Sequence, residues 1–136
     1  MTPHLYTASF TVDNDDLDET GHMNNVRYLY RLQEAAIAHW KLLSDATVRE
    51  NYLWVARRHE LDYLASAFLG ESLTIRTFVG ECRGALSTRH YEITRDNDGQ
   101  RIVQAQTRWC LLQRDGMKVV RIPAAIAALF ESQEHE

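Results

Sequence analysis

The sequence predicts an α+β domain in which one antiparallel β-sheet curls around one long central helix, followed by a short C-terminal helix. Three observations support this. Only residues 26–43 carry a long helical period of apolar residues. Four long segments after that helix have strand character and are separated by turn or loop sequences. A chain of 136 residues suits one hydrophobic core, so we expect residues 1–136 to form a single domain.

The first strand is predicted at residues 5–12, where β-branched and aromatic residues dominate. A polar, acidic loop follows over residues 13–25, and Asn24 or Asn25 is expected to cap the long helix. One face of that helix should carry Leu29, Leu32, Ala36, Trp40 and Leu43. This apolar face must be buried against the sheet.

The second half of the chain is predicted to be mostly β. We expect a polar loop at residues 44–51, strands at 52–67, 73–82, 85–95 and 101–113, and a short last strand at 118–121. Turn sequences at 96–99 and 115–116 favour antiparallel pairing of neighbouring strands. Pro123 should begin the helix at 124–130, and the charged tail from 131 to 136 should be frayed.

Composition excludes several classes of partner. The net charge is −4, so the chain lacks the basic excess that nucleic-acid binding requires. The longest apolar run, residues 124–130, is much shorter than the roughly 20 residues of a membrane span. The N-terminus has no signal-peptide pattern, so we expect a soluble, cytoplasmic protein without a membrane partner. The two cysteines, Cys82 and Cys110, are expected to be reduced and buried.

Residues 16–25, with the sequence DLDETGHMNN, concentrate the groups that carry chemistry. Three carboxylates, a histidine and two asparagines meet where the long helix is predicted to begin. The free backbone N–H groups of a helix N-terminus can polarise a carbonyl oxygen and stabilise an oxyanion. A nearby aspartate, ionised at neutral pH, could act as a base or a nucleophile. Alternatively, these residues only complement the helix dipole and cap the helix.

The pattern Asp-x-Asp-x-x-Gly-His-x-Asn-Asn-x-x-Tyr-Leu resembles the signature of the hotdog-fold thioesterases. It is formed by Asp16, Asp18, Gly21, His22, Asn24, Asn25, Tyr28 and Leu29. The nearest group is the 4-hydroxybenzoyl-CoA and acyl-CoA thioesterase family, to which the acyl-ACP thioesterases are related. Residues 60–73 resemble, more weakly, the family's second strand and the turn after it. Residues 106–109 and 121–123 resemble its last long strand and the start of its C-terminal helix. The resemblance implies the hotdog fold, which agrees with the architecture predicted above.

The resemblance also implies roles for individual residues. Asp18 matches the family's catalytic carboxylate, and Asn25 matches the residue whose backbone N–H polarises the thioester carbonyl. His22 matches a histidine of the acyl-ACP relatives, although Thr20 stands where they have an asparagine. Glu60 is a candidate for the later glutamate of those relatives, at a different spacing.

Further candidates are less specific. Asn24 and His22 are expected to orient water or the loop. Three residues are candidates for substrate binding, namely Tyr28, Arg57 and Arg58. One of the two arginines could grip a CoA phosphate, although ordinary surface arginines are the alternative for both, as for Arg83 and Arg89. Mid-helix Glu34 is expected to pair with Arg31.

Together these observations predict an acyl-CoA thioesterase in which Asp18 activates water or attacks the carbonyl itself. Nothing in the sequence implies a metal or an organic cofactor. Exposed sheet edges and the resemblance predict a homodimer or homotetramer. The alternatives are an acyl-ACP thioesterase, a hotdog hydroxyacyl dehydratase that pairs His22 with Glu34, and a non-catalytic acyl-CoA-binding domain.

Overall fold

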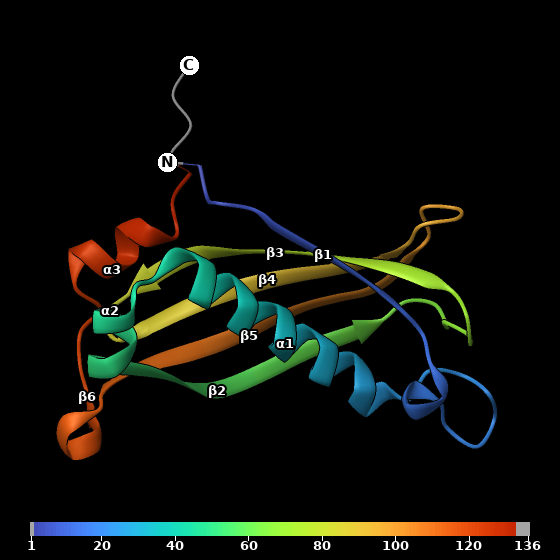
Figure 1. Cartoon of the computed structure of the whole chain (residues 1–136), viewed down its shortest axis with the longest axis horizontal. Helices are drawn as coiled ribbons and strands as arrows, with labels where there is room; N and C mark the ends of the chain where they lie inside the picture. Colours follow the sequence, from blue (N-terminus) through green and yellow to red (C-terminus); the bar gives the residue numbers. More distant parts are fainter. Residues whose placement is uncertain (1, 133–136) are drawn as a thin grey trace.

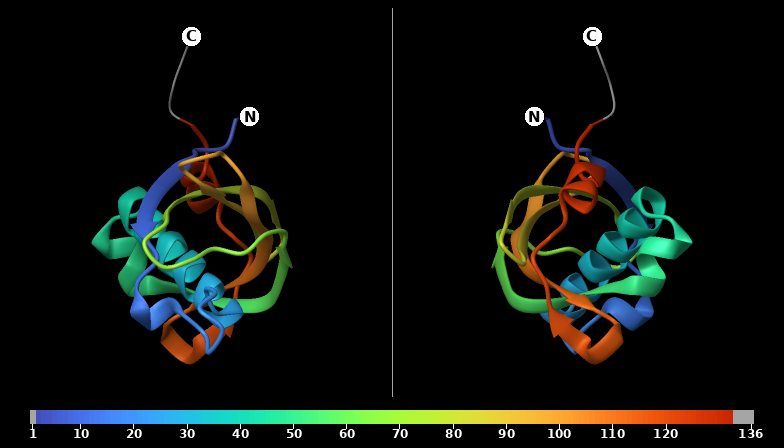
Figure 2. Two further views of the ribbon diagram at one scale, coloured as in Figure 1. Left: turned by 90° about the vertical axis from the view of Figure 1, so that its right-hand side faces the viewer. Right: turned by 90° about the vertical axis from the view of Figure 1, so that its left-hand side faces the viewer.

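A six-stranded antiparallel sheet curls around one long helix in the computed structural model, which describes residues 2–132 (Figures 1 and 2). The strands are β1 (Tyr6–Thr11), β2 (Tyr52–Tyr63), β3 (Ser72–Arg83), β4 (Leu86–Arg95), β5 (Arg101–Gln113) and β6 (Lys118–Val119). The helices are α1 (Asn25–Leu43), α2 (Ala46–Asn51) and α3 (Ala124–Leu129), with 3₁₀ turns η1 (Asn14–Asp16) and η2 (Asp115–Met117). Across the sheet the order is β1–β3–β4–β5–β2, and β6 pairs with the end of β5. The predicted α+β architecture is confirmed.

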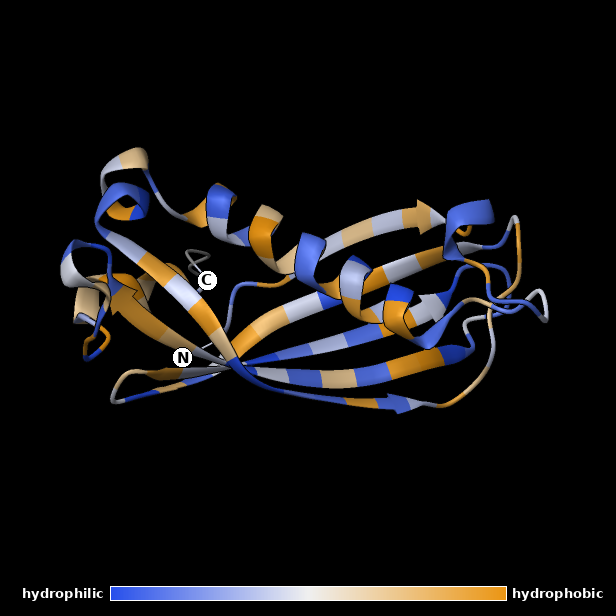
Figure 3. Ribbon diagram, turned by 90° about the horizontal axis from the view of Figure 1, so that it is seen from below, coloured by the Kyte–Doolittle hydropathy of each residue, from blue (hydrophilic) through white to orange (hydrophobic). Residues whose placement is uncertain are grey.

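Polar and apolar side chains alternate along the strands, so one face of the sheet is apolar (Figure 3). On β3 the buried residues are Leu73, Ile75, Thr77 and Val79, as well as Thr74 near the strand's start, whereas Arg76 is exposed. This is the alternation that the sequence predicts for a strand with one buried face. The long axis of α1 lies across the buried face, and its N-terminus is at the end of the sheet opposite α2 and α3 (Figure 1).

Helix α1 begins where predicted, because the Asn24 side chain accepts a hydrogen bond from Val26 N at 2.9 Å. Its buried residues are Tyr28, Leu32, Ala35, Ala36 and His39. The buried face is therefore turned slightly from the predicted one. Leu29 and Trp40 belong to the predicted apolar face, but in the structure both are only half-buried. A helix inside a curled sheet buries a wide arc, which accommodates His39 because that side chain finds polar partners.

Those partners include Arg89, for which the sequence left open either a phosphate contact or an ordinary surface position. Arg89 is only 3% exposed and donates from Nη1 to His39 Nδ1 at 2.9 Å and to Thr77 Oγ1 at 3.1 Å. The other ring nitrogen of His39 lies 2.9 Å from His4 Nδ1. The surface alternative for Arg89 is wrong because hydrogen bonds across three elements allow a polar side chain to be buried.

Other expectations also need correction. Residues 46–51 form helix α2 rather than a loop, since Asp45 caps that turn by accepting from Val48 N at 2.9 Å. Cys110 is buried as expected, but Cys82 is exposed near the end of β3. The start of the tail is paired rather than frayed: Glu131 bridges to Pro3, and Ser132 N donates to Thr2 O at 2.8 Å. Residues 133–136 of that predicted tail lie outside the described residues.

Within residues 2–132, no helix is both long enough and apolar enough to span a membrane.

Candidate active site

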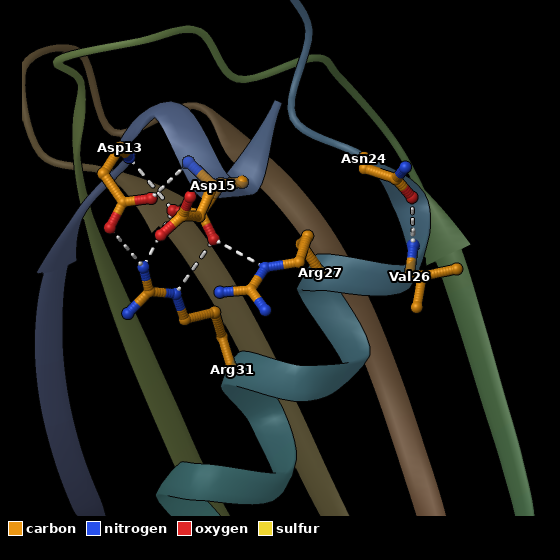
Figure 4. Close-up of polar contacts among 7 residues, drawn as sticks. Asp13, Asp15, Asn24, Val26, Arg27 and Arg31 are labelled. Atoms are coloured by element: carbon orange, nitrogen blue, oxygen red, sulfur yellow. Dashed lines mark hydrogen bonds and ion pairs between the residues drawn. The ribbon is translucent and has the colours of Figure 1, made fainter. Parts of the chain in front are cut away.

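The loop before α1 is anchored by a buried carboxylate. Asp16 is fully buried and accepts hydrogen bonds from Arg27 Nε at 3.0 Å and from Arg31 Nη2 at 2.8 Å. Figure 4 shows Arg27 and Arg31 reaching from α1 toward the turn that carries Asp13 and Asp15. Burial acts to raise the pKa of Asp16, but the bonds from Arg31, Asp13 N and Arg27 outweigh it and hold the pKa below its usual value. Asp16 thus ties the loop to the helix.

This arrangement also corrects the expected pairing of Glu34. Arg31 forms ion pairs with Asp16 and, at 3.5 Å, with Asp13, whereas Glu34 is exposed further along the helix. Arg31 is directed at the loop because two carboxylates there, one of them buried, hold its guanidinium.

Asp18 lies two residues further on, in a different environment. Its Oδ1 atom accepts three hydrogen bonds, from Thr20 N at 2.9 Å, Thr20 Oγ1 at 2.7 Å and His22 N at 3.1 Å. The bond from the Thr20 hydroxyl is the main reason why the pKa of Asp18 is below its usual value, so the carboxylate is ionised at neutral pH. The Oδ2 atom accepts no hydrogen bond from residues 2–132, so it is available to a water molecule or a substrate.

Thr20 links Asp18 to His22. The hydroxyl group donates its proton to Asp18, so Thr20 Oγ1 can only accept from His22 Nδ1, which lies 2.6 Å away. The neutral imidazole therefore carries its proton on Nδ1 and leaves Nε2 without one. Phe68 fixes the ring from the side, with ring centroids 5.0 Å apart, and the His22 and Phe68 backbones form a β-bridge. The loop thus holds a His22–Thr20–Asp18 chain in one orientation.

The N-terminus of α1 supplies the second chemical element. Asn24 is engaged as the N-cap, so its side-chain oxygen is turned to Val26 N. Asn25 is the first residue of the helix, and its backbone N–H has no acceptor among residues 2–132. Tyr63 Oη donates to Asn25 O at 3.2 Å and fastens this turn to β2. A free N–H at the positive end of a 19-residue helix suits a carbonyl oxygen or an oxyanion.

Asp18 and Asn25 line the same pocket of about 410 Å³. The other lining residues are His22, Met23, Tyr28, Tyr63, Leu64, Ala65 and Ser66. Tyr28 is almost fully buried, and its hydroxyl accepts from Ala67 N at 3.2 Å. Burial raises the pKa of Tyr28, so it remains a neutral hydroxyl at the pocket wall. The structure therefore brings together four of the predicted site residues: Asp18, His22, Asn25 and Tyr28.

The remaining predicted site residues lie elsewhere in the chain. Glu60 is exposed on β2, where it pairs with Arg58 at 3.1 Å and accepts from Gln106 Nε2 at 2.8 Å. Arg57 occupies a bulge in β2, and its Nη2 lies 3.6 Å from Cys110 Sγ. None of these residues lines the pocket that contains Asp18.

Two residues of the site were not singled out from the sequence. Thr20 was noted only as a departure from the asparagine of the acyl-ACP relatives, although a hydroxyl between two polar residues of a tight loop favours local hydrogen bonding. The contact of Tyr63 with Asn25 was not predicted, because it depends on the pairing of segments that are distant in the sequence. Among the described residues, no cluster of three or more His, Cys, Asp or Glu side chains could hold a metal ion.

The chain matches a known protein family. The family model of the thioesterase-like superfamily matches residues 12–130. A sequence search of curated proteins finds no match.

Solved structures share the fold at low sequence identity. A 1,4-dihydroxy-2-naphthoyl-CoA thioesterase from Synechocystis is 18% identical, with a TM-score of 0.84 over 98% of this chain and 100% of that one. A variant of 4-hydroxybenzoyl-CoA thioesterase with asparagine in place of an aspartate, complexed with 4-hydroxybenzoyl-CoA, is 17% identical, with a TM-score of 0.84 over 93% and 99%. A 12:0-ACP thioesterase from Umbellularia californica is 15% identical, with a TM-score of 0.81 over 95% of this chain and 51% of that chain. At these identities the likeness establishes the fold, which is that of the hotdog thioesterases.

Proposed function

Because the chain belongs to the thioesterase-like superfamily and is a thioester hydrolase, we propose that it hydrolyses an acyl-CoA to the free acid and CoA in the Asp18 pocket. One observation carries this proposal: Asp18 and the N-terminus of α1 line the same pocket, the first with a free carboxylate oxygen and the second with a free N–H. An ionised carboxylate and an N–H donor are the two groups that thioester hydrolysis needs.

In the proposed reaction the thioester carbonyl lies against Asn25 N–H, which stabilises the negative charge that develops on the oxygen. Asp18 Oδ2 then follows one of two routes. As a base it takes a proton from water, whose oxygen attacks the carbonyl carbon as the C–S bond breaks. As a nucleophile it attacks that carbon itself and expels CoA thiolate, and water hydrolyses the resulting mixed anhydride. In both routes the thiolate leaves with the sulfur electrons and is then protonated.

Thr20 and His22 have positioning roles in this proposal. The three bonds to Oδ1 fix the plane of the Asp18 carboxylate and leave Oδ2 as its reactive atom. His22 holds the Thr20 hydroxyl in the orientation that donates to Asp18. We propose no catalytic role for Asn24, whose side chain is committed to the helix cap.

The experiment is a turnover assay with a thiol reagent across acyl-CoAs of several chain lengths and aromatic acyl-CoAs. We expect CoA release with at least one class, unchanged by exhaustive chelation because the proposed machinery contains only protein groups. No CoA release with any acyl-CoA, or activity that disappears with the chelator and returns with a divalent ion, would contradict the proposal. A dehydratase, which leaves the thioester intact, would give no thiol signal.

The carrier is a separate question, because the fold is shared with a 12:0-ACP thioesterase as well as with CoA thioesterases. The same acyl group should be presented on CoA and on ACP at equal concentration. We expect the higher kcat/KM with CoA, and the opposite order would identify acyl-ACP as the substrate.

We further propose that the chain works as a homodimer or homotetramer. Among residues 2–132, strand β2 pairs only with β5 and so forms one edge of the sheet. An edge strand of 12 residues is long enough to pair with a second copy. Tyr63 and Leu64, at the end of this strand, are exposed and line the Asp18 pocket. Light scattering at assay concentration should show an oligomer, and an active monomer would refute this proposal.

A further inference from the structure

A second cavity lies at the other end of α1, between the C-terminal half of the helix and the buried face of the sheet. Its volume is about 300 Å³, at the lower end of the range for small-molecule sites. Aromatic residues dominate its wall: Trp40, Tyr52, Trp54, Trp109 and Phe130. None of its lining residues lines the Asp18 pocket, so it is a separate site within one chain.

Every charged residue that lines this cavity is positive, although the whole chain has a net charge of −4. The four residues are Lys41, Arg49, Arg89 and Arg114. Arg49 is held by the Ser44 carbonyl, and Arg114 Nε donates to Arg49 O at 2.7 Å. A cavity with low-dielectric walls and only positive charges concentrates anions.

Arg89 is the buried member of this set. Both hydrogen bonds that it donates come from Nη1, so Nε and Nη2 have no acceptor among residues 2–132. These two nitrogens form one edge of the guanidinium, the edge that binds both oxygens of a carboxylate. No carboxylate of residues 2–132 forms an ion pair with Arg89, so its charge is buried without a counter-ion. Such a charge is costly unless a ligand compensates it.

Two further properties of the cavity wall favour an anionic ligand. Burial lowers the pKa of Arg89 to about 10, which still leaves the side chain protonated at neutral pH. Trp54 Nε1, in the same wall, is buried and has no acceptor among residues 2–132. The unsatisfied side-chain groups of Arg89 and Trp54 are donors, so a ligand that fits them must supply acceptors.

We propose that this cavity binds a small carboxylate with an apolar or aromatic body, held by the Nε–Nη2 edge of Arg89. The aromatic wall receives the body of the ligand, and the cationic rim attracts its charge. Free carboxylic acids are also the acyl products of thioester hydrolysis. The inference does not depend on that activity, because it rests on the cavity and its donors alone.

Intrinsic fluorescence tests the proposal directly, since all three tryptophans of the chain line this cavity. The full-length protein is titrated with 3-phenylpropionate and, in parallel, with the neutral 3-phenylpropanol. We expect a saturable change with the carboxylate and at least roughly tenfold weaker binding of the alcohol, because a hydrogen bond to a charged group is stronger than one between neutral groups. Equal binding of the two compounds, or no saturable change with either, would overturn the proposal.

Variants then locate the binding site. Arg89→Gln should weaken binding of the carboxylate at least tenfold, and Arg89→Lys should also weaken it, because an ammonium lacks the two-pronged edge. Arg76→Gln, at an exposed arginine of β3 that does not line the cavity, and Asp18→Asn, in the other pocket, are controls that should change affinity less than threefold. Thermal melting identifies any Arg89 variant that fails to fold. In that case the difference in affinity between 3-phenylpropionate and 3-phenylpropanol for the wild-type chain decides whether the proposal holds. Binding that survives in a folded Arg89→Gln variant, or that is lost in Asp18→Asn, would refute the assignment.

Discussion

Asp16 and Asp18 are separated by one residue of the same loop, yet they occupy opposite environments. Asp16 is fully buried and holds two arginines of α1, whereas Asp18 is bonded only to its own loop and keeps one oxygen free. Both carboxyls have a lowered pKa, but the main favourable cause is Arg31 for Asp16 and the Thr20 hydroxyl for Asp18. A lowered pKa therefore does not distinguish the two carboxylates, whereas a free oxygen that faces a pocket is found at Asp18, the proposed catalytic group, and not at Asp16.

The two aspartates of this short motif therefore have different roles. The first carboxylate fixes the loop to the helix, and this fixed loop then presents the second carboxylate beside the helix N-terminus. The ion pairs of Asp16 with Arg27 and Arg31 join the loop that carries Asp18 to α1, whose first residue is Asn25. Variants of Asp18, Asp16 and Thr20 test this division, beginning with the one expected to have the largest effect.

Asp18→Asn should lower turnover at least a hundredfold, the low end of the roughly 10²–10⁴ range for a positioned acid or base. Asparagine keeps the size of the side chain and accepts the same bonds through Oδ1, but it has no negative charge. The thermal midpoint should change little because Asp18 is exposed. Steady-state hydrolysis with parallel thermal melting is the measurement. A rate near that of the wild type would place the catalytic group elsewhere and make Glu34 and Glu60 the next candidates.

Asp16→Asn should act on stability. Its side chain is buried between Arg27 and Arg31. Removing one partner of a buried ion pair typically costs about 3–5 kcal/mol, and because both arginines are partly exposed we expect about 2–3 kcal/mol. Urea unfolding measures this cost, and turnover per folded molecule should stay within an order of magnitude of the wild type.

Asp15→Asn is the matched control, since Asp15 is an exposed carboxylate in the same 3₁₀ turn. It should change the free energy of unfolding by no more than about 0.5 kcal/mol. If Asp16→Asn is as stable as Asp15→Asn, or if it abolishes turnover in a folded protein, the division of work between the two carboxylates is wrong.

The contrast also shows how far the sequence could predict this molecule. Strand positions and the start of α1 followed from local patterns, since alternation and an asparagine cap are properties of neighbouring residues. The burial of Asp16, His39 and Arg89 did not, because each of these side chains finds partners from other elements of the fold. Asp18 was predicted to be the catalytic carboxylate through the family resemblance. Its link to Thr20 is local and was within reach of the sequence.

His39 is buried without an ion pair, so its contribution to the free energy of unfolding should depend on pH differently from that of Asp16. Burial, with the Arg89 charge, lowers the pKa of His39 to about 3 from its usual 6.5. Because the folded pKa is the lower one, the stability from the neutral ring is full above pH 6.5 and is lost as the pH falls toward 3. The loss should be about 1 kcal/mol per pH unit. The Asp16 contribution should be lost only below about pH 3.8, its usual pKa.

The measurement for His39 is urea unfolding of the wild type and His39→Gln between pH 7.5 and 4.5. Glutamine offers both an acceptor and a donor but does not titrate. The wild type should lose more stability than the variant across this range. Identical slopes would show that His39 does not remain neutral inside the folded protein.

Thr20→Val should have a smaller effect on turnover than Asp18→Asn and addresses the Asp18 side of the comparison. Valine keeps the shape and the backbone N–H but removes the hydroxyl that joins His22 to Asp18. Loss of the strongest bond to the carboxylate should raise the pKa of Asp18 toward its usual value, so the acid limb of kcat/KM should move to higher pH. A charge-assisted hydrogen bond at the weak end, about 1.5 kcal/mol, corresponds to roughly a tenfold fall in turnover at neutral pH. Thr20→Ser restores the hydroxyl and should restore both the rate and the pH profile. If the valine and serine variants have the same rate and the same acid limb, the loop presents Asp18 without the help of its hydroxyl bridge, and the backbone N–H groups of Thr20 and His22 alone position the carboxylate.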